Sequence, residues 1–157
     1  MQLTLLCIGK TGKSFLEEGE REYIKRLSHY VSFDVVILPD IKQAKSLSEE
    51  QIKIKEGLQF LDKIQPQDSV LLLDERGKQF DSIEFSNYIQ DQFNRGGKHI
   101  YFLVGGPYGF SDAIYQRANG KISLSKMTFS HQMIRLFFIE QLYRAMTILK
   151  GEPYHHR

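Results

Sequence analysis

Short apolar runs alternate with amphipathic segments along the whole chain, and this alternation restricts the fold more than any other feature of the sequence. The runs lie at residues 3–8, 33–38, 70–73 and 100–104 and are made mainly of apolar side chains. Such runs are typical of strands that are covered on both faces. A helical segment follows each run, so the strands should be joined by crossovers and lie parallel. We therefore predict an α/β fold, a mainly parallel sheet flanked by helices, in one domain spanning residues 1–157.

Capping and stop signals give approximate limits for the helices. Ser14 can cap the first helix, Ser48 and Gln51 form the pattern of a capping box, and Gly96-Gly97 can end the third helix. We expect helices over residues 14–30, from Ser48 to Ile64, and over 82–95, 112–118 and 130–150, with a short strand at 122–124.

Size and composition place the chain among ordinary globular proteins. A chain of 157 residues can bury about two-thirds of its unfolded surface, so it can be stable without a disulfide or a structural metal. No apolar run approaches the roughly 20 residues of a membrane span, and the start lacks a signal-peptide pattern, so we expect a cytoplasmic protein. The single cysteine, Cys7, excludes an internal disulfide. The formal net charge of +2 is too small to indicate nucleic-acid binding by itself.

The last predicted helix has more apolar surface than a single interface needs. A helix that is apolar nearly all round is buried on more than one face. In a domain this small the second face plausibly meets another subunit, so the sequence predicts a dimer through this helix. The residues of the main stripe are Ile134, Phe138, Leu142, Ala145 and Leu149, and those that widen it are Met133, Leu136, Phe137, Ile139 and Met146.

The position of a ligand follows from the predicted sheet. Ligands of parallel sheets bind beyond the carboxyl ends of the strands, which selects the loops after Ile8, Leu73, Val104 and Leu124. The glycines of residues 105–109 allow close approach of the backbone to a ligand, although many ordinary turns look similar. The apolar side chains and free backbone groups of residues 124–131 suit an adenine, and the alternative is a helix-entry loop capped by Ser130.

Two other site types fit poorly. Gly12-Lys13-Ser14 resembles the end of a phosphate-binding loop, but that motif needs a glycine at position 7, where Cys7 stands. A nucleotide triphosphatase would need a magnesium-dependent site at Lys13, and it is the weakest of the functional alternatives. His155 and His156 have no other clustered ligands around them in the sequence, so we predict no metal site.

The basic residues near the carboxyl terminus have two interpretations. They could gather at an RNA-facing cleft, or Arg144 could simply pair with Glu140 one helical turn away. The basic set consists of Arg135, Arg144, Lys150, His155 and Arg157.

Four segments, in order, resemble the ribosomal RNA large subunit methyltransferase H family. They are residues 105–109, 124–135, 140–145 and 151–155, and the resemblance covers essentially the whole chain. It implies a SPOUT-type α/β fold with a C-terminal trefoil knot, S-adenosylmethionine as cofactor, and a homodimer with its active site at the subunit boundary. It also implies methylation of N3 of a pseudouridine in a stem-loop of 23S rRNA, within assembled ribosomes.

The resemblance also assigns site residues by position. The cofactor would contact Leu73, Gly105, Leu124, Ser125, Lys126, Met127, Thr128 and Phe129, and the substrate side would hold Arg144, Tyr154 and His155. Because the N3–H of the base is only weakly acidic, we hypothesise that His155 takes this proton while Arg144 steadies the resulting anion or a phosphate. The main alternative is a ribosome-binding protein that keeps the fold without turnover.

Overall fold

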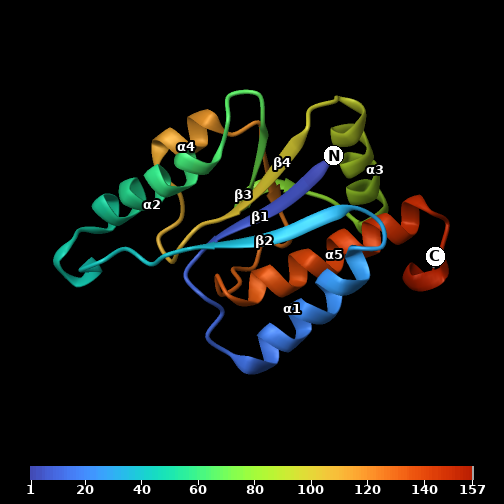
Figure 1. Ribbon diagram of the computed structural model, residues 1–157, viewed down its shortest axis with the longest axis horizontal. Coiled ribbons are helices and arrows are strands. Elements are labelled where there is room, and N and C mark those ends of the chain that lie inside the picture. Colours follow the sequence, from blue (N-terminus) through green and yellow to red (C-terminus); the bar gives the residue numbers. More distant parts are fainter. Residues whose placement is uncertain (157) are drawn as a thin grey trace.

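The computed structural model describes residues 1–156 and contains one parallel five-stranded sheet in the order β2-β1-β4-β3-β5 (Figure 1). The predicted α/β class is therefore confirmed. The strands are β1 (Gln2–Ile8), β2 (Ser32–Leu38), β3 (Ser69–Gln79), β4 (His99–Val104) and β5 (Gly120–Ser123).

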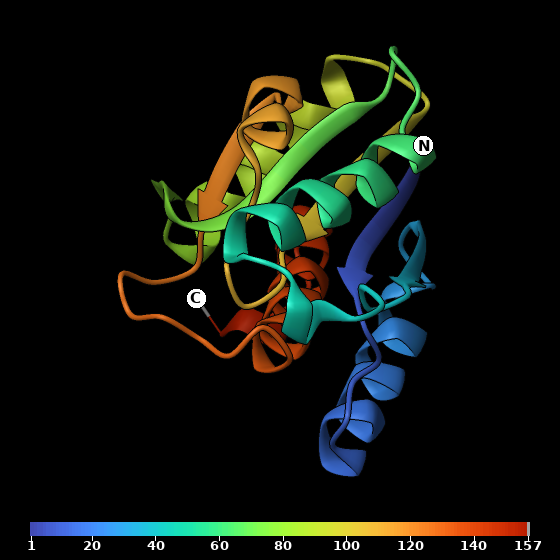
Figure 2. The ribbon, with the colours of Figure 1, turned by 90° about the vertical axis from the view of Figure 1, so that its left-hand side faces the viewer.

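Helices cover both faces of the sheet (Figures 1 and 2). One face packs against α1, α3 and α5, with Phe138 of α5 at the centre of its core, and the other packs against α2 and α4, around Phe60. The helices are α1 (Ser14–Leu27), α2 (Glu49–Lys63), α3 (Ser82–Asn94), α4 (Asp112–Arg117) and α5 (Met133–Leu149), with short 3-10 turns η1 (Ala44–Ser46) and η2 (Pro153–His155).

The helix starts depend on side chains that bond to free backbone groups. Ser48 and Gln51 form the predicted capping box at α2. Ser14 is the first residue of α1 and does not cap it. Ser130 does not open α5, which begins at Met133, but its hydroxyl accepts the Met133 N–H at 3.0 Å. The predicted start was three residues early because this hydrogen bond closes a turn that precedes the helix.

The predicted apolar stripe of α5 faces the sheet. Phe138, Leu142 and Ala145 are buried, as expected from their helical spacing. Arg135 is buried with them, at 1% exposure, so it does not lie at an RNA-facing cleft. Its guanidinium donates to the carbonyl oxygens of Ile8 and Gly9, both at 2.8 Å. Within residues 1–156 no helix, α5 included, has the length and apolarity needed to cross a membrane.

β3 is longer than predicted because it pairs with β5 twice. Ile122 of β5 lies opposite Leu73 and also opposite Lys78, with a register shift between the two pairings. A Cβ on Gly77 would lie 2.7 Å from backbone atoms of Ile122, so the segment after Leu73 runs tightly against β5. Only glycine fits at this contact. The trefoil knot that the resemblance implies stays a prediction.

Candidate functional site

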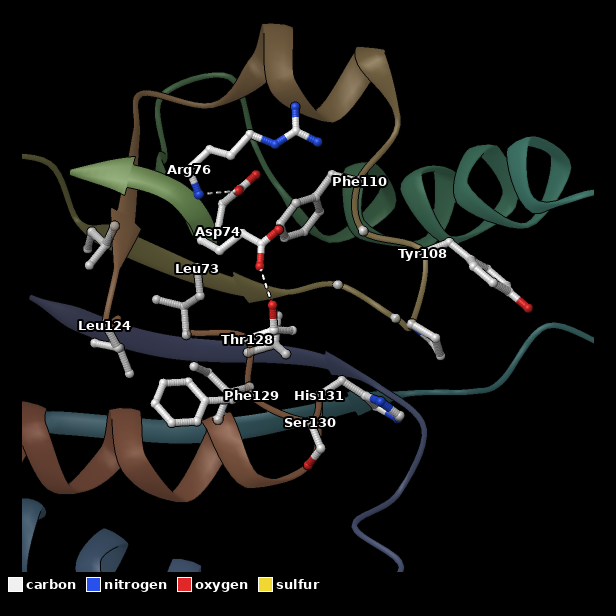
Figure 3. Close-up of a pocket in the computed structure, with 18 of the residues that line it drawn as sticks. Leu73, Asp74, Arg76, Tyr108, Phe110, Leu124, Thr128, Phe129, Ser130 and His131 are labelled. Atoms are coloured by element: carbon white, nitrogen blue, oxygen red, sulfur yellow. Dashed lines mark hydrogen bonds between the residues drawn. The ribbon is translucent and has the colours of Figure 1, made fainter. Parts of the chain in front are cut away.

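A cavity of about 600 Å³ opens at the carboxyl edge of the sheet. Its walls come from β3 and from the loops after β4 and β5 (Figure 3). Lys53 of α2 and Ile134 of α5 also line it. This volume lies within the range of small-molecule and cofactor sites, about 300–1,000 Å³. The cavity lies at the edge of the sheet that the strand-end rule selected.

Most residues that the resemblance assigned to the cofactor line this cavity. They are Leu73, Gly105, Leu124, Ser125, Met127, Thr128 and Phe129. Lys126 is exposed and does not line it. The sequence reasoning missed Asp74, Glu75, Arg76 and Tyr115, although the first three directly follow Leu73 at a strand end that had been selected.

One wall is the loop between β5 and α5, and three hydrogen bonds shape it. Ser123 Oγ donates to the Ser125 carbonyl at 2.8 Å, and Ser125 Oγ accepts the Met127 N–H at 2.9 Å. Thr128 Oγ1 donates to the Glu75 carboxylate at 2.6 Å, which ties this loop to the middle of β3 (Figure 3). The loop is thus held at both sides of the cavity, with Phe129 packed on Phe137 of α5.

The facing wall is fixed by Asp74, midway along β3. Its carboxylate accepts the hydroxyl of Tyr115 and the backbone N–H of Arg76, the latter at 2.9 Å. Burial, together with the hydrogen bond to Asp74, raises the pKa of Tyr115 to about 12. Tyr115 therefore stays protonated near neutral pH and remains a donor to Asp74.

The base of the cavity near α5 is organised by Arg135. Besides the two β1 carbonyls, its guanidinium donates to the His131 carbonyl at 3.2 Å and to Thr11 Oγ1 at 3.3 Å. Burial, and then the nearby Arg135 cation, lower the pKa of His131, so its imidazole is held neutral beside the cavity. Arg135 thereby joins the end of β1 to the loop that follows β5.

The three predicted substrate-side residues form a compact cluster around Glu140. Glu140 Oε1 accepts Arg144 Nη2 at 2.5 Å and the Tyr154 hydroxyl at 2.9 Å. Arg144 Nη1 donates to His155 Nδ1 at 3.1 Å, and its guanidinium lies 4.8 Å from the centre of the Tyr154 ring. The Glu140–Arg144 pair that the sequence left as an alternative is therefore present, and it also orders the tail.

The tail packs on α1 as well as on α5. The Tyr154 hydroxyl lies 3.3 Å from that of Tyr23, and the Tyr154 ring stacks edge-on against Tyr143. The Tyr30 hydroxyl donates to Glu152. These contacts give residues 151–156 a defined place on their own chain. Arg157, which the sequence grouped with the basic residues, lies outside the described residues.

The cavity and the tail cluster are separate within one chain. Ile134 lines the cavity at the start of α5, whereas Arg144 lies ten residues further along the same helix. At a rise of about 1.5 Å per residue these positions are roughly 15 Å apart. Figure 1 places the carboxyl terminus at the far end of α5 from the loop that precedes it. The structure thus brings together each half of the predicted site but does not join the halves.

Known proteins resemble this chain over its full length. A family model described as "Predicted SPOUT methyltransferase" matches residues 1–155. The "Ribosomal RNA large subunit methyltransferase H" of Christiangramia forsetii is 59% identical over 100% of both chains. The protein of the same name from Parabacteroides distasonis is 56% identical over 99% of both.

Solved structures share the fold at low sequence identity. A "probable methylase family protein" from Haemophilus influenzae matches with a TM-score of 0.55 and 11% identity, over 97% of this chain and 69% of that one. A methyltransferase from Legionella pneumophila, solved with bound SAM, matches with a TM-score of 0.51 and 12% identity, over 92% of this chain and 66% of that one. The full-length family match and the identity to these relatives show that the chain belongs to the SPOUT methyltransferases, among the ribosomal RNA large subunit methyltransferase H proteins.

Proposed function

We propose that this chain binds S-adenosylmethionine and methylates N3 of a pseudouridine in a stem-loop of 23S rRNA, on assembled ribosomes in the cytoplasm. The observation that carries the proposal is the cavity at the carboxyl edge, because seven of the eight residues that the resemblance assigned to the cofactor line it. The names of the full-length relatives support large-subunit rRNA as the substrate. The exact nucleotide and the ribosomal context come from the resemblance.

The cavity has the properties that this cofactor requires. Leu73, Leu124 and Phe129 supply apolar surface for an adenine, and the 105–109 and 124–129 loops bring backbone groups to the same space. Bound S-adenosylmethionine would supply a methyl group that is already strongly electrophilic. The protein then mainly has to align this methyl with the attacking nitrogen and keep water away. The loop tied by Thr128 to Glu75 is suited to both tasks.

The tail cluster is proposed to act on the substrate. Because Arg144 donates to His155 Nδ1, the imidazole carries its proton on Nε2 in this arrangement. Nδ1 becomes available to take the N3 proton only when Arg144 turns to another acceptor. The anion that forms on the base is such an acceptor, so the two residues could exchange partners during the reaction.

A homodimer would join the two halves of the site. The tail cluster cannot reach the cavity of its own chain without leaving Tyr23 and Glu140, whereas a second copy can present its tail there. The outer face of α5 also exposes apolar side chains that suit such a contact. Their exposed fractions are 40% for Met133 and 41% for Phe137; the loop before α5 adds Met127 at 78%, and the start of α1 adds Phe15 at 64%.

The decisive experiment is methyl transfer from labelled S-adenosylmethionine to ribosomes from cells that lack the modification, with free 23S rRNA in parallel. We expect label on one stem-loop pseudouridine, in ribosomes and not in free RNA. Label on free RNA alone would contradict the ribosomal context. Cofactor binding without any transfer would instead support a ribosome-binding protein without turnover.

The Thr128–Glu75 hydrogen bond provides a milder test of the cavity. Thr128→Val keeps the shape of the side chain but removes the donor to Glu75. A lost hydrogen bond to a charged group is worth about 1.5–3 kcal/mol, and part of this should appear as a Kd for S-adenosylmethionine raised roughly fivefold. Calorimetric titration measures it. The change should disappear in a Glu75→Ala background, which has no acceptor for the Thr128 hydroxyl, since the two residues share one interaction.

A further inference from the structure

Glu56 of α2 is a buried carboxylate that the site described above does not use. It is 5% exposed, and one of its oxygens, Oε1, has no hydrogen-bond partner among the described residues. Burial raises the pKa of this carboxyl, and the nearby Asp40 carboxylate raises it further. Burying an acidic group in such surroundings costs free energy of folding, so the contacts of Glu56 are expected to give it a role.

The other oxygen of Glu56 lies against the glycine turn after β4. The carboxylate packs against Gly106, because a Cβ there would lie 2.5 Å from Glu56 Oε2 and 2.8 Å from Oε1. The backbone N–H of Gly106 faces the carboxylate closely enough to favour its ionised form, which offsets part of the rise in its pKa. The Gly106 carbonyl is also engaged, because it accepts the Gly109 N–H at 3.1 Å. The Gly106 carbonyl is therefore held within the turn, and the carboxylate of α2 is packed against the same residue.

We propose that Glu56 is a positioning residue for the cofactor loop. By packing against Gly106, with the backbone N–H of that residue near its charge, it sets the orientation of the turn whose residues Gly105 to Gly109 line the cavity. No cation within hydrogen-bond distance competes for the carboxylate, since Lys53, one turn earlier on α2, pairs with Glu50 at 3.0 Å. This inference rests on the proposed function, because it assigns the turn to cofactor binding.

The proposal predicts an effect on binding and not on methyl transfer. Glu56 contacts the turn but does not line the cavity. Removing its side chain should therefore weaken the binding of S-adenosylmethionine without altering the alignment of a bound molecule. Loss of the packing contact with Gly106, and of the attraction between the carboxylate and the nearby N–H, should raise the Kd and the KM for the cofactor roughly tenfold in Glu56→Ala, with kcat at saturation within about twofold. A general loss of structure would lower kcat as well.

Calorimetric titration with S-adenosylmethionine and amide hydrogen exchange at Gly106 test the proposal together. We expect faster exchange at Gly106 and weaker binding in Glu56→Ala, with partial recovery in Glu56→Gln, which keeps an acceptor oxygen. The matched control is Asp62→Ala, an exposed acidic residue of the same helix, which should change neither quantity. If Glu56→Ala does not fold, Glu56→Asp serves instead, because it keeps the charge but draws the carboxylate away from Gly106.

A double-mutant cycle adds an independent criterion. Gly106→Ala should weaken binding because its methyl group collides with Glu56, and removing the Glu56 side chain in the same molecule should relieve part of that loss. Fast exchange at Gly106 with unchanged cofactor affinity would overturn the inference. So would additive effects in the cycle. A wild-type protein that binds no S-adenosylmethionine would instead contradict the proposed function itself.

Discussion

Replacing Arg135 with alanine is expected to lower the free energy of unfolding by about 3–5 kcal/mol, the range for breaking a buried charged network. The guanidinium is 1% exposed and donates to three backbone carbonyls, those of Ile8, Gly9 and His131. Alanine would leave these acceptors buried without partners, at about 1–3 kcal/mol for each unsatisfied group. It would also leave Glu20, a buried neighbour whose pKa burial already raises, without a nearby cation.

Unfolding in denaturant, followed by circular dichroism, measures this effect. Arg26→Ala is the control, because the Arg26–Glu22 pair lies at the surface with a 42% exposed guanidinium side chain, and such pairs contribute at most about 1 kcal/mol. The loss in the free energy of unfolding for Arg135→Lys should lie between those of Arg135→Ala and Arg26→Ala, since an ammonium supplies a point charge but not the planar set of donors. An alanine variant as stable as Arg26→Ala would show that the buried network contributes little.

A mixed dimer should recover activity that both of its parent proteins have lost. His155→Ala, or Arg144→Ala, is expected to lower kcat by roughly 100-fold or more, the usual scale for a proton-transfer or anion-stabilising group. Gly105→Trp should block the cavity while leaving the tail in place. If tails serve the partner's cavity, a dimer with one chain of each kind has one intact composite site.

Co-purified dimers with two different affinity tags would be assayed by methyl transfer to ribosomes. The expected activity is about half that of the wild-type dimer, because one site is whole and the other carries both lesions. Each homodimer alone serves as the control. Activity that stays at the level of the homodimers would show that the tail acts within its own chain. The tail would then have to move across the separation of about 15 Å along α5.

The strands and helices were predictable because their signals are local. The run from Ile100 to Val104 became the core of β4, and the Ser48–Gln51 capping box starts α2, as residue type and spacing required. The observed boundaries differ from the predicted ones where a tertiary contact determines the end of an element. β3 continues to Gln79 because β5 offers a second pairing partner, which no pattern within residues 74–79 indicates.

Buried charge was the main feature that the sequence did not reveal. Arg135 and Glu56 look like surface residues, and only the surrounding backbone decides otherwise: carbonyls of β1 meet Arg135, and the Gly106 N–H meets Glu56. The cofactor loops were predictable because parallel strands end at one edge. The resemblance assigned both halves of the site by position, but it could not reveal their distance, which depends on the length and direction of α5.

The place of α5 in the chain has a consequence for how the protein is made. Phe138, Ile139 and Leu142 are fully buried against the sheet, so the last helix completes the core beneath β1 and β4. A nascent chain grows from its amino terminus, and until α5 emerges it would present the apolar side chains Leu3, Leu5 and Phe102 to solvent. Stable folding therefore has to wait until α5 has been synthesised, and chaperones can act on the exposed apolar side chains before that point. A truncated product that lacks α5 would aggregate or be degraded, and would not persist as a partly active fragment.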